Sequence, residues 1–230
     1  MKILVIVPAY NEQDNIRHTL RDLAENGGNP DVLVINDCSR DRTEDVLREL
    51  EVPHLTLPVN LGIGGGVQAG YRYAREHGYD IAVQFDGDGQ HEAKYLAALT
   101  EPLIREEADV VIGSRFVEKE GFQSSAARRV GIHFLSWLIT LLCGVRVLDV
   151  TSGMRAVNRR FIDAYADHYA QDYPEPEALL LAGIRGARIQ EVPVQMRERA
   201  RGRSSISALR GIYYMVKVSL ALIIGRFTRK

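Results

Sequence analysis

Short apolar runs alternate with stretches of helical spacing over the first half of the chain. Continuous apolar runs of this length are typical of strands buried on both faces, and they lie at 3–7, 31–36, 55–57, 81–85 and 109–113. Apolar residues three or four positions apart predict helices through Ile16, Leu20 and Leu23 and over 43–50, 67–76 and 95–105. Strands that alternate with helices form βαβ units, so we predict an α/β fold with a mostly parallel sheet.

The pattern changes after residue 120, where two longer apolar stretches lie at 130–148 and 212–227. A helix that spans a bilayer needs about 20 mostly apolar residues, and polar interruptions such as His133 and Lys217 make both stretches borderline. Aromatic residues and cations at their edges suit helices that lie in a membrane interface. We therefore predict peripheral membrane contact; the alternative is that the two helices pack on each other or on the sheet.

Polar clusters follow four of the predicted strands, at 8–12, 36–40, 60–66 and 86–90. In open parallel sheets, ligands bind beyond the carboxyl ends of the strands. Because the four clusters converge on one such edge, we predict that they form a single binding site.

The cluster at 86–90 carries the most specific chemistry. Asp86 and Asp88 are one residue apart after a buried strand, and an extended backbone would project both carboxylates to the same side. Mg²⁺ usually takes one or two carboxylates and shares its other positions with water and substrate phosphates. The pair therefore predicts a divalent cation site, although Asp and Gly are also common in plain turns.

Composition limits the class of protein. The 230 residues are 46% hydrophobic and 26% charged, which is ordinary for a folded globular protein, and the net charge of −1 gives no reason to expect nucleic-acid binding. Cys38 and Cys143 lie far apart, which fits neither a disulfide scaffold nor a zinc site and suits a reducing compartment. The first apolar run is too short for a signal peptide, so we expect a cytoplasmic protein.

Seven motifs, in order, resemble the family 2 inverting glycosyltransferases, whose catalytic domain has the GT-A fold. The first four are the segments 7–12, 36–39, 60–64 and 86–90. Three later segments, 113–116, 151–155 and 199–204, are similar to the branch with dolichol- or polyprenyl-phosphate mannosyl- and glucosyltransferases. The resemblance runs from about residue 3 to about 205. It implies a GT-A domain over 1–205, followed by a C-terminal amphipathic interfacial helix over 206–230.

The resemblance implies that a UDP- or GDP-hexose binds at the predicted sheet edge. It assigns nucleotide-sugar binding to Pro8, Tyr10, Asn11, Glu12, Asp37, Asn60, Gly62, Gly64, Asp86 and Gly87. It also implies that Asp86, Asp88 and Gln90 hold Mg²⁺ or Mn²⁺, which would stabilise the leaving nucleoside diphosphate. Helix-terminal charges are the alternatives for Asp37 and Glu12. Asp37 does not choose the base, because uracil and guanine both carry an N–H that it could accept.

For the acceptor, the resemblance points to arginines. A lipid phosphate is already ionised and needs cationic contacts rather than a general base, and the planar fork of arginine suits it. Arg115, Arg155 and Arg199, with Ser204, are the candidates, and a surface ion pair is the alternative for each arginine. Relatives often carry Lys where Ser205 stands, which weakens the case for a lipid-phosphate acceptor.

Two further polar residues lie near these motifs. Glu177 occupies the place of an acidic residue in relatives and would orient a sugar hydroxyl or hold an arginine; a helix N-terminal charge beside a proline is the alternative. His91 adjoins the acidic cluster without metal-ligand spacing, so we assign it no role.

We therefore predict a metal-dependent inverting glycosyltransferase that moves a hexose to a dolichyl or undecaprenyl phosphate in cell-envelope glycan synthesis. It would act at the inner face of the cell membrane, with a small membrane protein or a second copy as a further expected partner. The alternatives are transfer to a saccharide hydroxyl in surface polysaccharide assembly and a non-catalytic nucleotide-sugar-binding subunit. A nucleotidyltransferase would need a basic loop after its first strand, and residues 8–11 contain no Lys or Arg.

Overall fold

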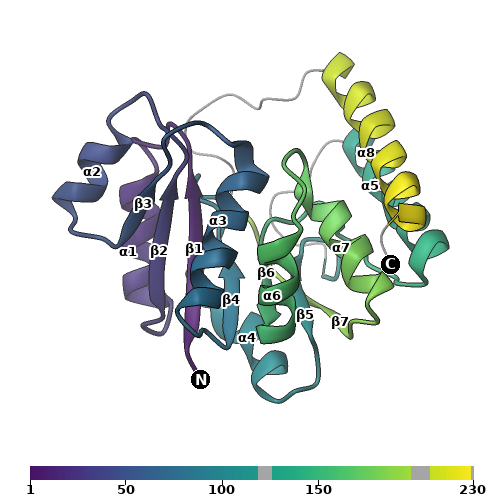
Figure 1. Cartoon of the computed structure of the whole chain (residues 1–230), viewed down its shortest axis with the longest axis horizontal. Coiled ribbons are helices and arrows are strands. Elements are labelled where there is room, and N and C mark those ends of the chain that lie inside the picture. Colours follow the sequence, from purple (N-terminus) through teal and green to yellow (C-terminus); the bar gives the residue numbers. More distant parts are fainter. Residues whose placement is uncertain (119–125, 198–207, 229–230) are drawn as a thin grey trace.

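The computed structural model describes residues 1–118, 126–197 and 208–228. These residues form a seven-stranded sheet in the order β3-β2-β1-β4-β6-β5-β7 (Figure 1). The strands are β1 (Ile3–Ala9), β2 (Asp31–Asn36), β3 (His54–Thr56), β4 (Ile81–Gln84), β5 (Val110–Ser114), β6 (Arg155–Asn158) and β7 (Ile189–Pro193). Only β6, among these strands, runs antiparallel to its neighbours, β4 and β5. The predicted α/β fold with a mostly parallel sheet is confirmed.

Helices cover both faces of the sheet. They are α1 (Ile16–Asn26), α2 (Thr43–Glu49), α3 (Gly62–Glu76), α4 (Leu96–Ile104), α5 (Ala126–Cys143), α6 (Arg159–Asp167), α7 (Pro174–Ile184) and α8 (Ala208–Thr228), with a short 3-10 helix at Ala93–Tyr95. Alternate residues of β1 serve the two faces: Leu4 and Ile6 join a core with α3, α6 and α7, while Val5 and Val7 join a core with α1, α2 and α4. This two-sided burial is why the strand reads as a continuous apolar run.

The structure corrects the predicted start of α3, which begins at Gly62 rather than Val67. The glycine-rich segment is therefore the first turn of a helix and not a loop. A Cβ at Gly64 would stand 1.8 Å from the carbonyl oxygen of Ala170, and one at Gly70 would stand 2.3 Å from Ile6 Cγ2. These glycines let α3 pack closely on β1 and on the segment after α6.

The second half of the chain holds elements that the apolar pattern did not predict, namely β6, α6 and β7. The two long apolar stretches form α5 and α8, which pack on each other and on α7. Val218 and Leu222 of α8 are buried there. No helix in the described ranges has the length and apolar character needed to cross a bilayer. A boundary between two units at residue 205 stays a prediction.

Candidate active site

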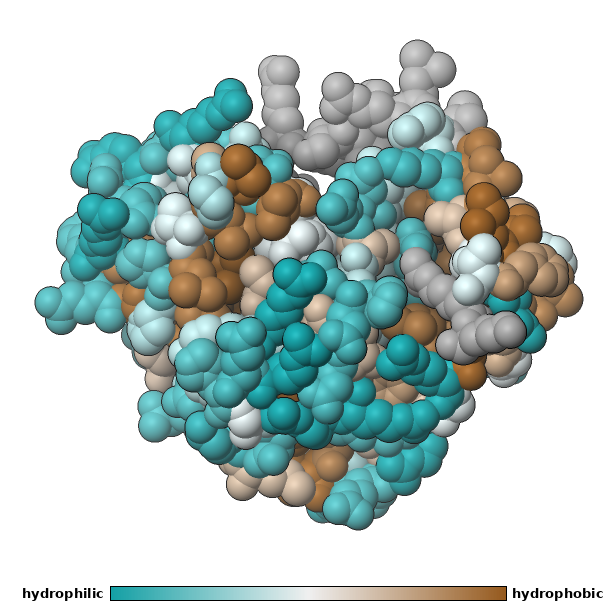
Figure 2. Space-filling model, in the orientation of Figure 1, coloured by the Kyte–Doolittle hydropathy of each residue, from teal (hydrophilic) through white to brown (hydrophobic). Residues whose placement is uncertain are grey.

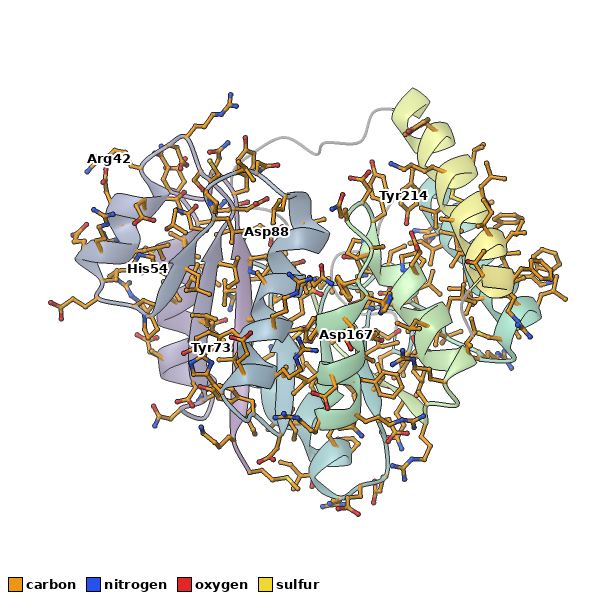
Figure 3. All side chains as sticks on the ribbon, in the orientation of Figure 1. Arg42, His54, Tyr73, Asp88, Asp167 and Tyr214 are labelled. Carbon is orange, nitrogen blue, oxygen red and sulfur yellow. The ribbon has the colours of Figure 1, made fainter. Side chains whose placement is uncertain are left out.

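The loops after β1, β2 and β4, together with the start of α3, meet at one edge of the sheet. The Asp37 N–H donates to the Ala9 carbonyl (2.9 Å), and the Gly87 N–H donates to the Pro8 carbonyl (3.3 Å). The Leu61 N–H donates to Asp37 Oδ1 at 2.7 Å. The predicted convergence of the four polar clusters is therefore confirmed, and Figure 3 places Asp88 at this upper end of the parallel strands.

Asp37 lies at the centre of the junction and is 4% exposed. Its carboxylate accepts from Leu61, which precedes the first residue of α3, and its carbonyl accepts from the side chain of Asn60 at 3.1 Å. Helix α2 begins at Thr43 with Arg42 before it, so Asp37 is not its N-terminal cap. The residue instead ties β2 to the start of α3.

The residues after β1 form a second set of loop contacts. Asn11 has a left-handed backbone with φ of 57°, donates its N–H to Ser39 Oγ (3.0 Å), and accepts from the Arg40 N–H through Oδ1 (2.8 Å). Glu12 lies ahead of α1, outside its first turn, and its N–H donates to Thr43 Oγ1 at 2.9 Å. Tyr10 is 42% exposed beside them. Asn11 and Glu12 therefore fix the β1 loop against the β2 loop.

The two predicted nucleotide-site glycines of α3 differ in what they approach. Gly62 has a φ of 76°, a conformation that side chains rarely adopt, so it permits the sharp entry into the helix. Gly64 donates its N–H to the Gln171 carbonyl at 3.0 Å. The close approach that Gly64 permits is therefore between α3 and the backbone of Ala170 and Gln171.

The acidic cluster is a turn, which corrects the expectation of an extended backbone through Asp86 and Asp88. The Gly87 N–H donates to the Pro8 carbonyl, and a Cβ at residue 87 would stand 3.0 Å from that oxygen, so glycine permits this close approach. Asp88 is 9% exposed, and its Oδ1 accepts from the Gln90 N–H at 3.0 Å. The sequence allows either a cation site or a plain turn for this motif. The backbone forms a turn at the predicted sheet edge, and cation binding stays a prediction.

Asp86 is held from three sides. Gln84 Nε2 donates to Asp86 Oδ1 at 3.2 Å, and the Asp86 N–H donates to His91 Nδ1 at 3.0 Å. Because Nδ1 accepts, the neutral ring carries its proton on Nε2, which lies 3.7 Å from Asp86 Oδ2. Gly153 closes the third side, since a Cβ there would stand 2.5 Å from Oδ2. His91 is 4% exposed, and its spacing in the sequence gives no sign of these contacts.

Gln90 connects the acidic turn to the segment after β7. Its carbonyl accepts from the Arg197 N–H at 2.8 Å, and its side-chain amide donates to the Arg197 carbonyl at 3.4 Å. Arg197 lies two residues before the motif that begins with Arg199 and ends with Ser204. Those two predicted acceptor residues lie outside the described residues.

The donor set at the turn suits a cation that is shared with a substrate. Within the described part of the chain, no group of three or more His, Cys, Asp or Glu side chains is placed to hold a metal ion. Two carboxylates at the sheet edge fit the usual protein share of a Mg²⁺ or Mn²⁺ site, in which phosphate oxygens and water complete the coordination. Asp86 and Asp88 therefore fit a cation that arrives with a diphosphate, not a closed structural metal site.

Arg115 forms a buried ion pair. Its Nε and one terminal nitrogen each lie 2.7 Å from a different oxygen of Asp149, which is fully buried, and its side chain also donates to Thr151 Oγ1 at 3.0 Å. Asp149 is fixed in turn because its N–H donates to Glu191. Arg115 thus holds the segment that leads to Gly153 through a buried ion pair and not a surface one, and its contact with the acceptor phosphate stays a prediction.

Arg155 lies beneath the site with no exposed surface. Its guanidinium donates to the carbonyl oxygens of Ser152 (2.6 Å) and Glu175 (3.2 Å), and its Nε has no hydrogen-bond partner among the described residues. It stands opposite Gln84 in the register of β6 with β4. In this position Arg155 supports backbone segments around the site, and direct contact with an acceptor stays a prediction.

The structure brings Glu175 to the acidic turn, whereas the sequence singled out Glu177. Both lie in the first turn of α7. Burial raises the pKa of Glu175, the nearby Arg155 guanidinium lowers it, and the charge of Asp86 raises it further. The Gln84 side chain also lowers the pKa of Glu175. Glu175 therefore interacts electrostatically with the site, and the role predicted for Glu177 stays a prediction.

Comparisons with known sequences agree on one family. The model of the family described as Glycosyl transferase family 2 matches residues 4–165. An undecaprenyl-phosphate mannosyltransferase of Micrococcus luteus is 33% identical over 219 residues, which cover 90% of this chain and 88% of that protein. A UDP-N-acetylglucosamine–dolichyl-phosphate N-acetylglucosaminyltransferase of Methanococcus voltae is 31% identical over 213 residues, 84% of each chain.

Solved structures show the same fold. Glucosyl-3-phosphoglycerate synthase from Mycobacterium tuberculosis, crystallised with Mn²⁺, UDP and phosphoglyceric acid, superposes with a TM-score of 0.73 at 20% identity. The match covers 98% of this chain and 78% of that one. The same synthase has also been crystallised with Mg²⁺ and UDP. These neighbours have the GT-A fold, so the predicted GT-A architecture is confirmed.

Proposed function

The chain belongs to glycosyl transferase family 2, and from this we propose that it transfers a hexose from a nucleotide sugar to the phosphate of a polyprenyl lipid. One observation carries the proposal: the Asp86–Asp88 turn is held where the β1, β2 and α3 loops meet, in a chain similar over most of its length to two polyprenyl-phosphate glycosyltransferases. The intact acidic turn argues against a non-catalytic subunit.

The donor would lie across this junction, with its base and ribose near Asp37 and its diphosphate at the acidic turn. A cation bound by Asp86 and Asp88 would supply Lewis-acid stabilisation of the negative charge on the leaving nucleoside diphosphate. The protein's own part is positioning. Asp37 fixes the start of α3 through its contacts with Asn60 and Leu61. Gln84 and Gly153 contact the carboxylate of Asp86, and His91 accepts from the Asp86 N–H.

The acceptor phosphate would attack the anomeric carbon directly. The new bond joins a phosphate oxygen to this carbon as the bond to the nucleoside diphosphate breaks, which inverts the configuration. A polyprenyl phosphate is ionised near neutral pH, so the step needs no general base. Arg199 and Ser204, in the segment that Gln90 and Arg197 connect to the turn, are the proposed contacts to the acceptor phosphate.

Membrane contact would deliver the lipid. The outer faces of α5 and α8 expose large apolar side chains at helical spacing: Val130, Phe134, Trp137, Leu141, Tyr213, Val216, Leu220, Ile223, Ile224 and Phe227. We call this set the apolar face. Figure 2 shows hydrophobic residues along the right-hand side, where Figure 1 places these two helices. Exposed patches rimmed by polar residues mark interaction sites, and here we propose the inner surface of the cell membrane, with a small membrane protein or a second copy as other occupants.

Transfer to a saccharide hydroxyl is the second candidate, and Glu175 favours it. A hydroxyl acceptor loses a proton as it attacks, which calls for a general base. A carboxylate that interacts electrostatically with Asp86, and whose pKa burial raises, has the chemistry for that task. Glu175→Gln tests this candidate, because it would abolish transfer to a hydroxyl and spare transfer to a phosphate.

The deciding experiment is incubation of the protein with radiolabelled UDP- and GDP-sugars, Mn²⁺ and undecaprenyl phosphate, followed by lipid extraction. We expect label in an acid-labile lipid product with one of the two nucleotides. Label that appears in a saccharide and never in the lipid fraction would favour the second candidate.

A further inference from the structure

The side chain of Gln84 lies between the acidic turn and the protein core. Gln84 ends β4 and has no exposed surface. Its amide makes hydrogen bonds in two directions: Oε1 accepts from the hydroxyl of Tyr169 at 3.2 Å, and Nε2 donates to Asp86 Oδ1 at 3.2 Å. A fully buried amide thus joins a tyrosine to a carboxylate that we propose as a metal ligand.

The chemistry of these partners fixes the orientation of the amide. An ionised carboxylate only accepts hydrogen bonds, so the NH₂ end of Gln84 must face Asp86. The hydroxyl of Tyr169 donates to the opposite end. The carboxylate of Asp86 therefore selects this orientation of the Gln84 amide, and the Tyr169 hydroxyl is compatible with it.

Tyr169 is itself held in a buried cluster of rings. Its ring meets those of Tyr71 and Tyr165 edge to face, with centroids 5.4 and 5.3 Å away. Tyr165 differs from Tyr169 in one useful way. Its hydroxyl donates to the Ala178 carbonyl at 2.9 Å, and among the described residues the tyrosine that hydrogen-bonds to Gln84 is Tyr169. The two tyrosines share a cluster but support different parts of the fold.

We propose that Gln84 and Tyr169 are positioning residues that hold the Asp86 carboxylate in the orientation needed for a divalent cation and its diphosphate. This inference rests on the proposed function. Gln84 fixes Oδ1, while Gly153 and His91 restrict Oδ2, so the carboxylate is held at both oxygens. Groups that hydrogen-bond to a metal ligand orient it, and their loss typically weakens metal binding about 10- to 100-fold.

The test is Mn²⁺ binding, measured from the loss of the free-ion electron paramagnetic resonance signal in the presence of UDP and, separately, GDP. Gln84→Met keeps the length of the side chain without its hydrogen bonds, and Tyr169→Phe removes only a hydroxyl. We expect both variants to weaken Mn²⁺ binding, Gln84→Met by about tenfold. Tyr165→Phe is the matched control and should bind Mn²⁺ within about twofold of the wild type, although it also loses a buried hydrogen bond.

Thermal unfolding of each variant separates positioning from folding. The proposal is overturned if Tyr169→Phe binds Mn²⁺ like the wild type, or if Tyr165→Phe weakens binding as much as Tyr169→Phe does. Should Gln84→Met fail to fold, the two tyrosine variants still decide. If the wild-type protein fails to bind Mn²⁺ both in the presence of UDP and in the presence of GDP, the proposed function itself is contradicted. This outcome differs from a failure of the positioning proposal.

Discussion

Gly153 lies against the carboxylate of Asp86, so closely that a Cβ at residue 153 would stand 2.5 Å from Oδ2 and 3.1 Å from Cγ. The contact joins two segments that are far apart in the sequence. Ser152 anchors the glycine by donating its hydroxyl to the Gly113 carbonyl at 2.6 Å. The segment before β6 therefore forms one wall of the candidate cation site.

Gly153→Ala should disturb this site directly. The added methyl group must displace the Asp86 side chain or the 152–154 backbone. We expect cation-dependent nucleotide binding to weaken roughly 10- to 100-fold, as when support for a metal ligand is lost. Isothermal titration calorimetry with UDP or GDP in the presence of Mn²⁺ measures this nucleotide binding. Gly131→Ala is the control, since its Cβ would meet the flexible end of Met215 at 3.0 Å; equal loss in both variants would contradict this account.

The Arg115–Asp149 pair should matter chiefly for stability. Removing one partner of a buried ion pair leaves an uncompensated charge, so Asp149→Asn should lower the free energy of unfolding by about 3 kcal/mol. Urea denaturation measures this change. If Arg115 acted mainly by binding the acceptor phosphate, Arg115→Met would raise the KM for the lipid acceptor and leave the free energy of unfolding unchanged. That result would contradict our expectation.

Glu44 should make the protein sensitive to acid. The pKa of Glu44 is lowered from 4.5 to about 2, first by a hydrogen bond from Thr56 and then by Asn36 and Arg48, against the opposing effect of burial. Because the folded pKa lies below the unfolded value, the stabilisation is fully present above about pH 4.5 and is lost as pH falls toward 2. Urea midpoints at pH 3 and pH 7 should therefore differ less in Glu44→Gln than in the wild type. An equal difference would show that Glu44 is not responsible.

Membrane contact should depend on the apolar face. Trp137 and Phe227 are 58% and 80% exposed, on α5 and α8. Trp137→Glu combined with Phe227→Glu should reduce co-sedimentation with vesicles that contain phosphatidylglycerol, because charge is costly at an apolar interface. Ile104→Glu is the matched control, since Ile104 is 45% exposed on α4, away from the apolar face. Unchanged sedimentation of the double variant would exclude this face as the membrane surface.

The first half of the fold could be predicted from the sequence because its strands are buried on both faces. Such strands appear as continuous apolar runs, and the polar ends of parallel strands must meet at one edge. The glycines of α3 were misleading, because close packing on Ile6 and Ala170 has the same sequence signature as a flexible loop. The short antiparallel strand β6 carries Arg155, a residue that the apolar pattern does not assign to a buried strand.

The site itself was predictable in part. The acidic turn and its neighbours at Pro8 and Asp37 follow from the ends of the strands. The supporting contacts of Gln84, His91 and Gly153 do not, because they depend on the turn at Gly87 and on the packing of β6 beside β4. The interaction of Glu175 with Asp86 depends on the orientation of α7, which the local sequence does not determine.

The central claim is that Asp86 and Asp88 bind the cation that holds the diphosphate of a nucleotide sugar. The most direct measurement is sugar transfer by wild type and Asp88→Ala, with Mn²⁺ and with a chelator, together with thermal unfolding of both. We predict that transfer by the wild type requires the cation and that Asp88→Ala is inactive with an unchanged melting temperature. Transfer by Asp88→Ala at the wild-type rate would contradict the account.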